Sequence, residues 1–142
     1  MEQEKISFVY PTLVREGMFA GGIYTPDLSM TIDNKEQKNL IAVTAGFAMK
    51  SVGMYAIEVE INEESAPLPT EHSLSGHIQT NYLERTKDGG QIAIFTMLSD
   101  NADLSNNGFY RVVVRLYKTS NGEKIGNRLD EKDCFFYVSH KD

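Results

Sequence analysis

The chain has 142 residues, of which 41% are hydrophobic and 24% are charged, and its formal net charge at pH 7 is −6. This length and composition predict a single globular domain, residues 1–142, whose core needs no disulfide or metal to be stable. The acidic balance argues against nucleic acid as a partner, because a protein that binds the phosphate backbone needs a dense Lys and Arg surface.

The cysteine content and the first residues predict the cellular location of the protein. Cys134 is the only cysteine, so the chain lacks the internal disulfides that small secreted domains normally contain. The start Met-Glu-Gln-Glu-Lys lacks the basic and then apolar pattern of a signal peptide, and no apolar run is long enough to cross a bilayer. We expect a soluble, cytoplasmic protein that does not bind membranes.

Alternation of apolar and polar residues predicts two strands near the start of the chain. They run from Lys5 to Tyr10 and from Leu28 to Ile32. Pro11 and Pro26 lie beside these segments, and proline confines a strand to a sheet edge or to a strand end.

Residues 33–50 permit two interpretations. Asp33 and Glu36 have the spacing of a helix capping box, and the apolar residues that follow recur with helical spacing. The same stretch contains β-branched residues, and Gly46 would weaken a helix. We prefer a strand here and keep the helix as the alternative.

Alternation of side chains with a period of two residues is clearest in two longer segments, Met54 to Asn62 and Phe109 to Lys118. The polar faces of these two strands carry opposite charges. The charged residues are Glu58 and Glu60 on the first strand and Arg111 and Arg115 on the second. Since opposite charges stabilise cross-strand pairs, we predict that the two strands are antiparallel neighbours.

Turn residues indicate further strands. Asp88-Gly89-Gly90 separates residues 75–86 from residues 91–99, and Asn121-Gly122 follows the Phe109 strand, as expected of hairpin turns. A last aromatic strand is predicted at residues 134–138. About eight short strands therefore predict an all-β fold, a two-sheet antiparallel sandwich.

One motif carries a resemblance to a known family. The run Asn106-Asn107-Gly108-Phe109-Tyr110-Arg111-Val112 resembles the start of strand F in the immunoglobulin fold. The resemblance implies that Tyr110 forms a tyrosine corner and that Val112 stands at the position of a disulfide cysteine. The cysteine pair and the Trp of that family are absent here. The resemblance implies an immunoglobulin-like sandwich and no particular function.

No metal or cofactor site is expected. His72 and His77 are an odd number of positions apart, so on a strand they would face opposite sides. Residues 100–106 are rich in oxygen donors but lack the spacing of a calcium loop. The glycines of residues 17–22 match neither the dinucleotide fingerprint nor the P-loop.

Catalysis is not expected either. Cys134 lies in an aromatic strand, where a small buried thiol is the usual interpretation, and His140 follows near the terminus with no evident orienting acid. The sequence also lacks the Gly-x-Ser-x-Gly elbow of hydrolases. We therefore predict a protein that is not an enzyme, with no catalytic residues and no cofactor.

The remaining hypothesis is a non-enzymatic protein-interaction module, which binds a protein partner or associates with itself, for example as a component or inhibitor in a phage or mobile-element assembly. Met18 and Phe19, flanked by glycines, form a candidate apolar anchor, with Tyr24 nearby, although these side chains could instead pack under the sheet edge. The connection from Thr119 to Asp133 is a second candidate binding segment.

An alternative hypothesis is a sandwich that binds a small molecule or carbohydrate in a groove on one sheet. Such sites present exposed aromatic rings, and the candidates are Tyr24, Tyr82 and Tyr117. The absence of Trp makes this alternative the weaker one.

Overall fold

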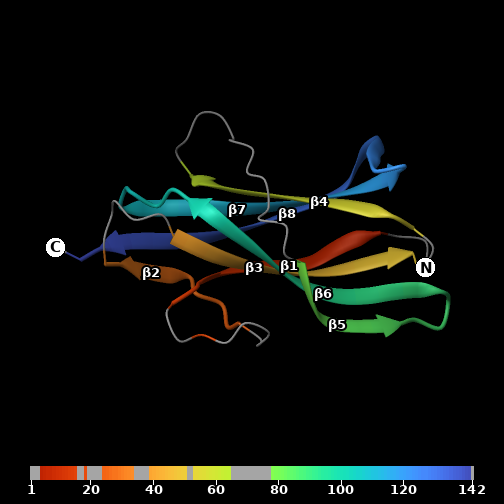
Figure 1. Ribbon diagram of the computed structural model, residues 1–142, viewed down its shortest axis with the longest axis horizontal. Coiled ribbons are helices and arrows are strands. Elements are labelled where there is room, and N and C mark those ends of the chain that lie inside the picture. Colours follow the sequence, from red (N-terminus) through yellow and green to blue (C-terminus); the bar gives the residue numbers. More distant parts are fainter. Residues whose placement is uncertain are drawn as a thin grey trace.

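The fold is described from a computed structural model, in which eight strands and no helix occur among the described residues. These residues are 4–15, 18, 24–33, 39–50, 53–64 and 78–141. The strands form two sheets of four strands each, which lie one above the other (Figure 1). The predicted fold class, an all-β two-sheet sandwich, is confirmed.

The order of the strands in each sheet differs from their order in the chain. The first sheet has the order β1-β3-β6-β5 and the second has the order β2-β8-β7-β4. All neighbouring strands are antiparallel except β2 and β8, which are parallel. The bounds are β1 (Lys5–Leu13), β2 (Ser29–Ile32), β3 (Asn39–Lys50), β4 (Tyr55–Glu63), β5 (Ile78–Arg85), β6 (Gly90–Ala102), β7 (Gly108–Ser120) and β8 (Glu123–His140).

β3 shows that the strand interpretation of residues 39–50 is correct and the helix interpretation is wrong there. The strand lies between β1 and β6, and residues 41–49 are all buried, so both of its faces are covered. A strand buried on both faces needs apolar or small side chains on both. Gly46 meets this need, because the ring of Phe8 packs across it from β1. Residues 34–38, with Glu36, lie outside the described part.

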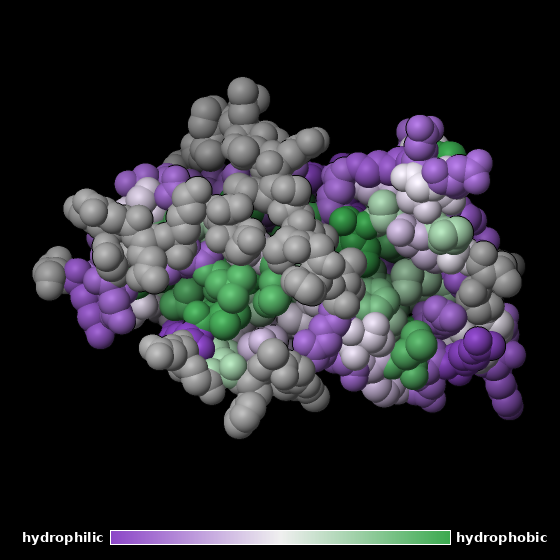
Figure 2. Space-filling model, viewed as in Figure 1, coloured by the Kyte–Doolittle hydropathy of each residue, from purple (hydrophilic) through white to green (hydrophobic). Residues whose placement is uncertain are grey.

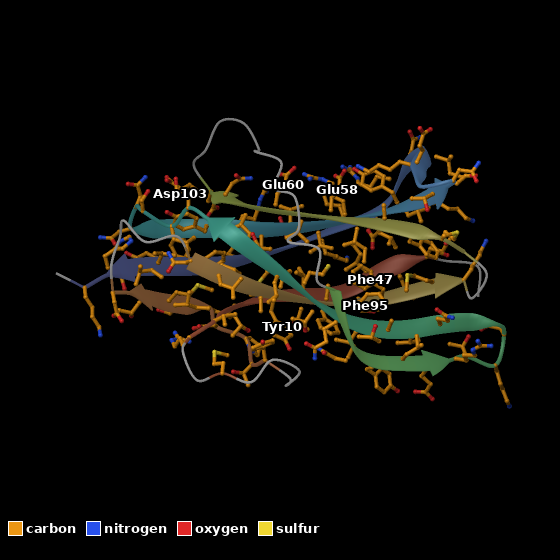
Figure 3. The ribbon with its side chains drawn as sticks, in the orientation of Figure 1. Tyr10, Phe47, Glu58, Glu60, Phe95 and Asp103 are labelled. Atoms are coloured by element: carbon orange, nitrogen blue, oxygen red, sulfur yellow. The ribbon has the colours of Figure 1, made fainter. Side chains whose placement is uncertain are left out.

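The core lies between the two sheets and consists of the inward side chains of alternate strand residues. Phe47 and Phe95 point into it from β3 and β6 (Figure 3), with their ring centroids 5.6 Å apart. Tyr110 on β7 stacks on Phe136 of β8, also at 5.6 Å. Burial of each such side chain contributes roughly 1.5–3 kcal/mol of stability, so this core holds the two sheets together.

The predicted pairing of the two charged strands is confirmed. β4 and β7 are antiparallel neighbours, and Glu58 lies opposite Arg115. The ion pair that Arg115 makes with β4 is a diagonal one, between its Nη1 and Glu60 Oε1 at 2.6 Å. Glu58 instead pairs with Lys124 of β8.

Arg111 departs from the predicted pattern. Asn62, not a glutamate, lies opposite it on β4. Its guanidinium therefore turns toward β8, where Nη1 is 3.6 Å from Asp133 Oδ2. Cross-strand charge pairing was predicted correctly for Arg115 and wrongly for Arg111.

Both predicted hairpin turns are present, and they require glycine or asparagine. Gly89 between β5 and β6 has φ +88°, while Asn121 and Gly122 between β7 and β8 have φ 53° and +81°. Positive φ values are unfavourable for other residues.

The predicted connection from Thr119 to Asp133 is wrong. β8 begins at Glu123 and continues through this segment to His140, paired with β7. The pairing shifts between Leu116 and Lys118, so extra residues of β8 bulge out, and Gly126 there has φ +71°. The strand is long because the Asn-Gly turn lets pairing continue from the turn to the C-terminal end.

The tyrosine corner implied by the family resemblance is present as a pair of hydrogen bonds. The Tyr110 hydroxyl donates to the carbonyl oxygen of Asn106 at 2.9 Å. The backbone N–H of Asn106 donates back to that hydroxyl at 3.2 Å. These bonds fix the turn that leads into β7.

Candidate protein-interaction face

The three predicted partner-binding residues have different environments. Met18 is half-buried, and its Sδ accepts a hydrogen bond from the Arg15 N–H at 3.1 Å. Phe19 lies outside the described residues. Tyr24 is only 7% exposed, and its carbonyl accepts a hydrogen bond from the Tyr10 hydroxyl at 2.6 Å. Binding by Met18 and Phe19 stays a prediction, and the buried ring of Tyr24 offers a partner little surface.

Apolar side chains reach the surface at several places (Figure 2). Isolated ones are normal on soluble proteins, whereas a contiguous group indicates a binding surface. On the outer face of β7 and β8, three exposed aromatic residues lie together. They are Phe109, Phe135 and Tyr137, which are 57%, 49% and 39% exposed.

This group arises from the period-two alternation of the two strands. Tyr110 and Phe136 point inward and are buried, so Phe109, Phe135 and Tyr137 point outward from the same sheet. Phe109 lies opposite Tyr137 in the register. Their rings meet edge to face, with centroids 5.1 Å apart and planes at 74°, a favourable aromatic geometry. We call Phe109, Phe135 and Tyr137 the aromatic face.

Acidic residues lie near the turn that leads into β7. The N–H of Glu64 donates to the Phe109 carbonyl at 3.0 Å, and Glu63 Oε1 accepts a hydrogen bond from Asn106 Nδ2 at 2.6 Å. Asp103 is exposed in the connection between β6 and β7.

Glu63 lies opposite Tyr110 in the register, so its side chain is on the inner side of the sheet with Tyr110 and not on the side of the aromatic face. Burial raises the pKa of Tyr110, its hydrogen bond with Asn106 opposes the rise, and the negative charges of Glu63 and Asp103 add to it. A phenolate would be repelled by both carboxylates. Glu63 and Asp103 therefore place negative charge near the Tyr110 hydroxyl.

The charges that border Phe135 cancel. Arg111 lies opposite Phe135 in the register, and its guanidinium pairs with Asp133 at 3.6 Å. Both side chains are about half exposed. This pair borders the rings without adding net charge.

The far end of the same sheet is built from paired charges. Arg115 contacts Glu60 and Glu131, each at 2.6 Å. Burial lowers the pKa of Arg115, but the hydrogen bonds with Glu60 and Glu131 outweigh it and raise the value. Glu60 is 5% exposed, so the polar face of β4 is covered at this residue. In Figure 3, Glu58 and Glu60 lie on the side of β4 away from the core.

The Cys134 and His140 side chains do not form a catalytic pair. Burial, and then the negative charge of Asp133, raise the pKa of the Cys134 thiol, which disfavours the reactive thiolate. The two ring nitrogens of His140 lie 2.6 Å from Asn107 Oδ1 and 2.7 Å from the Leu104 carbonyl. His140 thus ties the end of β8 to the turn before β7.

Metal ligands do not gather in the part of the chain that the structure describes: no three His, Cys, Asp or Glu side chains there could hold an ion together. His72, His77, the side chain of Asp100 and most of residues 17–22 lie outside that part. Within the same described ranges, no helix is long and apolar enough to cross a membrane.

The three tyrosines proposed for a ligand groove do not share a surface. Tyr82 is exposed on β5 of the first sheet. Tyr117 is half-buried on β7 of the second sheet, with the Lys124 ammonium 4.3 Å from its ring centroid. Tyr24 is buried. A single aromatic platform from these residues is therefore not formed.

Sequence reasoning missed the aromatic face, although a signal for it was present. Residues 134–138 were interpreted as one apolar strand, whereas the alternation rule divides them into inward and outward sets. The outward set then aligns with Phe109 only through the register of β7 and β8.

Neither the known protein-family models nor the curated proteins contain a match to this sequence.

Proposed function

We propose that this protein is a non-enzymatic interaction module and that it binds a protein partner through the aromatic face. The observation that carries the proposal is the grouping of three exposed rings, Phe109, Phe135 and Tyr137, on one face of adjacent strands. Exposed aromatic residues held close together are typical of protein-binding surfaces.

The strand backbone favours binding because it holds the rings in place before the partner arrives. β7 and β8 pair along most of their length, and Tyr110 and Phe136 anchor the inner side of the same strands in the core. Aromatic side chains also lose little conformational entropy on binding, since they have only two rotatable bonds. A partner therefore gains contact area at a low ordering cost.

We also propose that the sandwich is of the immunoglobulin-like type. In that fold one sheet has the strand order A-B-E-D and the other contains C, F and G. The order β1-β3-β6-β5 corresponds to A-B-E-D, and β4, β7 and β8 correspond to C, F and G. The hydrogen bonds between Tyr110 and Asn106 provide further support. Under this assignment the aromatic face lies on strands F and G.

Affinity capture from native cell extract tests the proposed function. The tagged wild type is compared with Phe135→Ser and with a matched control, Tyr82→Ser, which removes a similarly exposed ring (46%) from the other sheet. We expect a stoichiometric partner to be retained by the wild type and the control and lost by Phe135→Ser. Thermal unfolding establishes that all three proteins are folded.

Equal capture of the same partner by Phe135→Ser and the wild type would refute the aromatic face as the binding surface. Loss of the partner from both variants would refute it as well, because the effect would then not depend on the face that is altered.

A further inference from the structure

We infer that Asn121 is a site of spontaneous modification, at which its side-chain amide is lost as ammonia and a carboxylate takes its place. The chain contains two Asn-Gly sequences, Asn107-Gly108 and Asn121-Gly122. Glycine after asparagine favours this reaction, because no side chain shields the glycine nitrogen. Both asparagines are exposed, so the hydrogen bonds around each sequence decide which of them reacts.

The reaction needs a free amide side chain and a free backbone nitrogen. The nitrogen of Gly122 attacks Cγ of Asn121, the Cγ–Nδ2 bond breaks, and ammonia leaves with the proton that the glycine nitrogen gives up. Water then opens the cyclic imide that has formed. Cleavage between the nitrogen and Cγ yields aspartate, and cleavage of the other ring carbon–nitrogen bond yields isoaspartate. Water is the only co-reactant.

Both groups are free at the turn between β7 and β8. Asn121 and Gly122 form a two-residue turn, since Ser120 lies opposite Glu123 in the register. Within the described part of the chain, neither the Asn121 side chain nor the Gly122 N–H forms a hydrogen bond. The amide can therefore rotate toward the glycine nitrogen without losing a contact.

The amide of Asn107 is held by the end of β8. Its Oδ1 accepts a hydrogen bond from the backbone N–H of His140 at 2.9 Å. The same oxygen lies 2.6 Å from Nδ1 of the His140 ring. Rotation of the Asn107 side chain toward Gly108 would break both contacts.

The nitrogen of Gly108 is also held, by the pairing of β7 with β8. The Phe109 carbonyl accepts a hydrogen bond from the N–H of Glu64, so the backbone of Phe109 faces away from β8. Hydrogen-bonded and non-hydrogen-bonded pairs alternate along antiparallel strands. Gly108, which lies opposite Val138, therefore belongs to a hydrogen-bonded pair. Its nitrogen is not available for attack on Asn107.

Modification of Asn121 changes the turn in charge and in shape. Both products add one negative charge, and isoaspartate also adds a methylene carbon to the backbone. The present turn is closed by positive φ values of 53° at Asn121 and +81° at Gly122, and the longer backbone does not fit the same two-residue turn. Lys124, which contacts Glu58 and the Tyr117 ring, follows directly. We expect the tip of the hairpin to lose its pairing while the core stays folded.

Peptide mapping by mass spectrometry tests the inference on the folded wild-type protein, incubated in neutral buffer made with heavy-oxygen water. Fragment ions locate each converted residue, and the heavy oxygen shows that water opened an imide. We expect Asn121 to convert at least about tenfold faster than Asn107. The reason is that broken hydrogen bonds raise the activation free energy, of which about 1.4 kcal/mol corresponds to a factor of ten in rate.

The same chain unfolded in urea is the matched control, since it contains both sequences without the fold. There the two asparagines should convert at similar rates. Conversion of Asn107 as fast as Asn121 in the folded protein would overturn the inference. Survival of Asn121 in the folded protein, over a time in which both residues convert in urea, would overturn it as well.

A variant provides a second control on the folded protein. Asn121→Gly keeps a residue that accepts positive φ and removes the reactive amide. Ion-exchange chromatography should show a form with one more negative charge that accumulates in the wild type and not in Asn121→Gly. Equal accumulation of this form in both proteins would mean that another residue is modified, and the inference would fail.

Discussion

The outer face of the second sheet has two ends, which differ in how far contacts cover their side chains. At one end, Arg115 joins the buried carboxylate of Glu60 to Glu131. At the other end, Phe109 and Phe135 expose about half of their surface. The same strands, β7 and β8, contribute to both ends. Completed contacts at one end contribute to stability, whereas exposed groups at the other remain available for binding.

The largest expected loss of stability is at the end that contains Arg115, which we call the charged end. Arg115→Ala removes the partner of the buried Glu60, and breaking such a pair costs about 3 kcal/mol of unfolding free energy because a buried charge remains unpaired. Urea unfolding measures the loss. The double variant Glu60→Gln/Arg115→Met serves as the control and is expected to recover much of the stability. A loss below about 1 kcal/mol in the single variant would show that Glu60 is not desolvated.

A smaller loss of stability is expected for Tyr110, which is buried in the core behind the aromatic face. Tyr110→Phe keeps the ring stacked on Phe136 but removes both hydrogen bonds with Asn106. We expect a loss of about 1.5 kcal/mol, the upper part of the range for hydrogen bonds in proteins. Phe136→Leu serves as a comparison that perturbs packing and leaves the corner intact. An unchanged urea midpoint for Tyr110→Phe would show that the corner does not stabilise the turn.

The pH dependence of stability tests a third region, where Tyr55 packs against the core at the start of β4. Burial, and then the hydrogen bond to Glu4, raise the pKa of Tyr55 to about 12 from its ordinary value of 10.0. The folded state therefore holds the Tyr55 proton more tightly than the unfolded state. The resulting stability is complete below pH 10 and is lost as the pH rises through about 12.

Urea unfolding over this pH range should show a decline in the wild type that exceeds the decline in Tyr55→Phe by on the order of 1 kcal/mol, a value reduced for solvent screening. The tyrosines common to both proteins contribute equally to both curves, so the difference isolates Tyr55. Parallel curves for the two proteins would contradict the assignment.

The smallest effect on stability is expected on the aromatic face itself. Phe135→Ser removes an exposed ring and should change the free energy of unfolding by no more than about 0.5 kcal/mol, whereas we expect it to abolish the proposed partner binding. Replacement of the buried neighbour, Phe136→Ser, provides the contrast and should be strongly destabilising. A large loss in Phe135→Ser would mean that the ring stabilises the fold, and the distinction between the two ends would fail.

Local sequence signals determined most of the strand positions. Period-two alternation found β4 and β7, and the Asp-Gly-Gly and Asn-Gly turns located the hairpins of β5–β6 and β7–β8. The motif around Tyr110 implied a tyrosine corner, and the Tyr110 hydroxyl is hydrogen-bonded to the backbone of Asn106. These features depend on neighbours close in the chain, so the sequence contains the information needed to predict them.

The tertiary structure alone decided which surfaces are covered and which are open. Alternation assigns Glu60 and Phe135 to the outward sides of their strands, but Glu60 is buried under contact with Arg115 while Phe135 stays exposed. The register of β7 and β8 brings Phe109 to Tyr137, and these residues are far apart in the chain. Exposure depends on contacts between distant segments, and for this reason the period of the sequence could predict the strands but not the aromatic face.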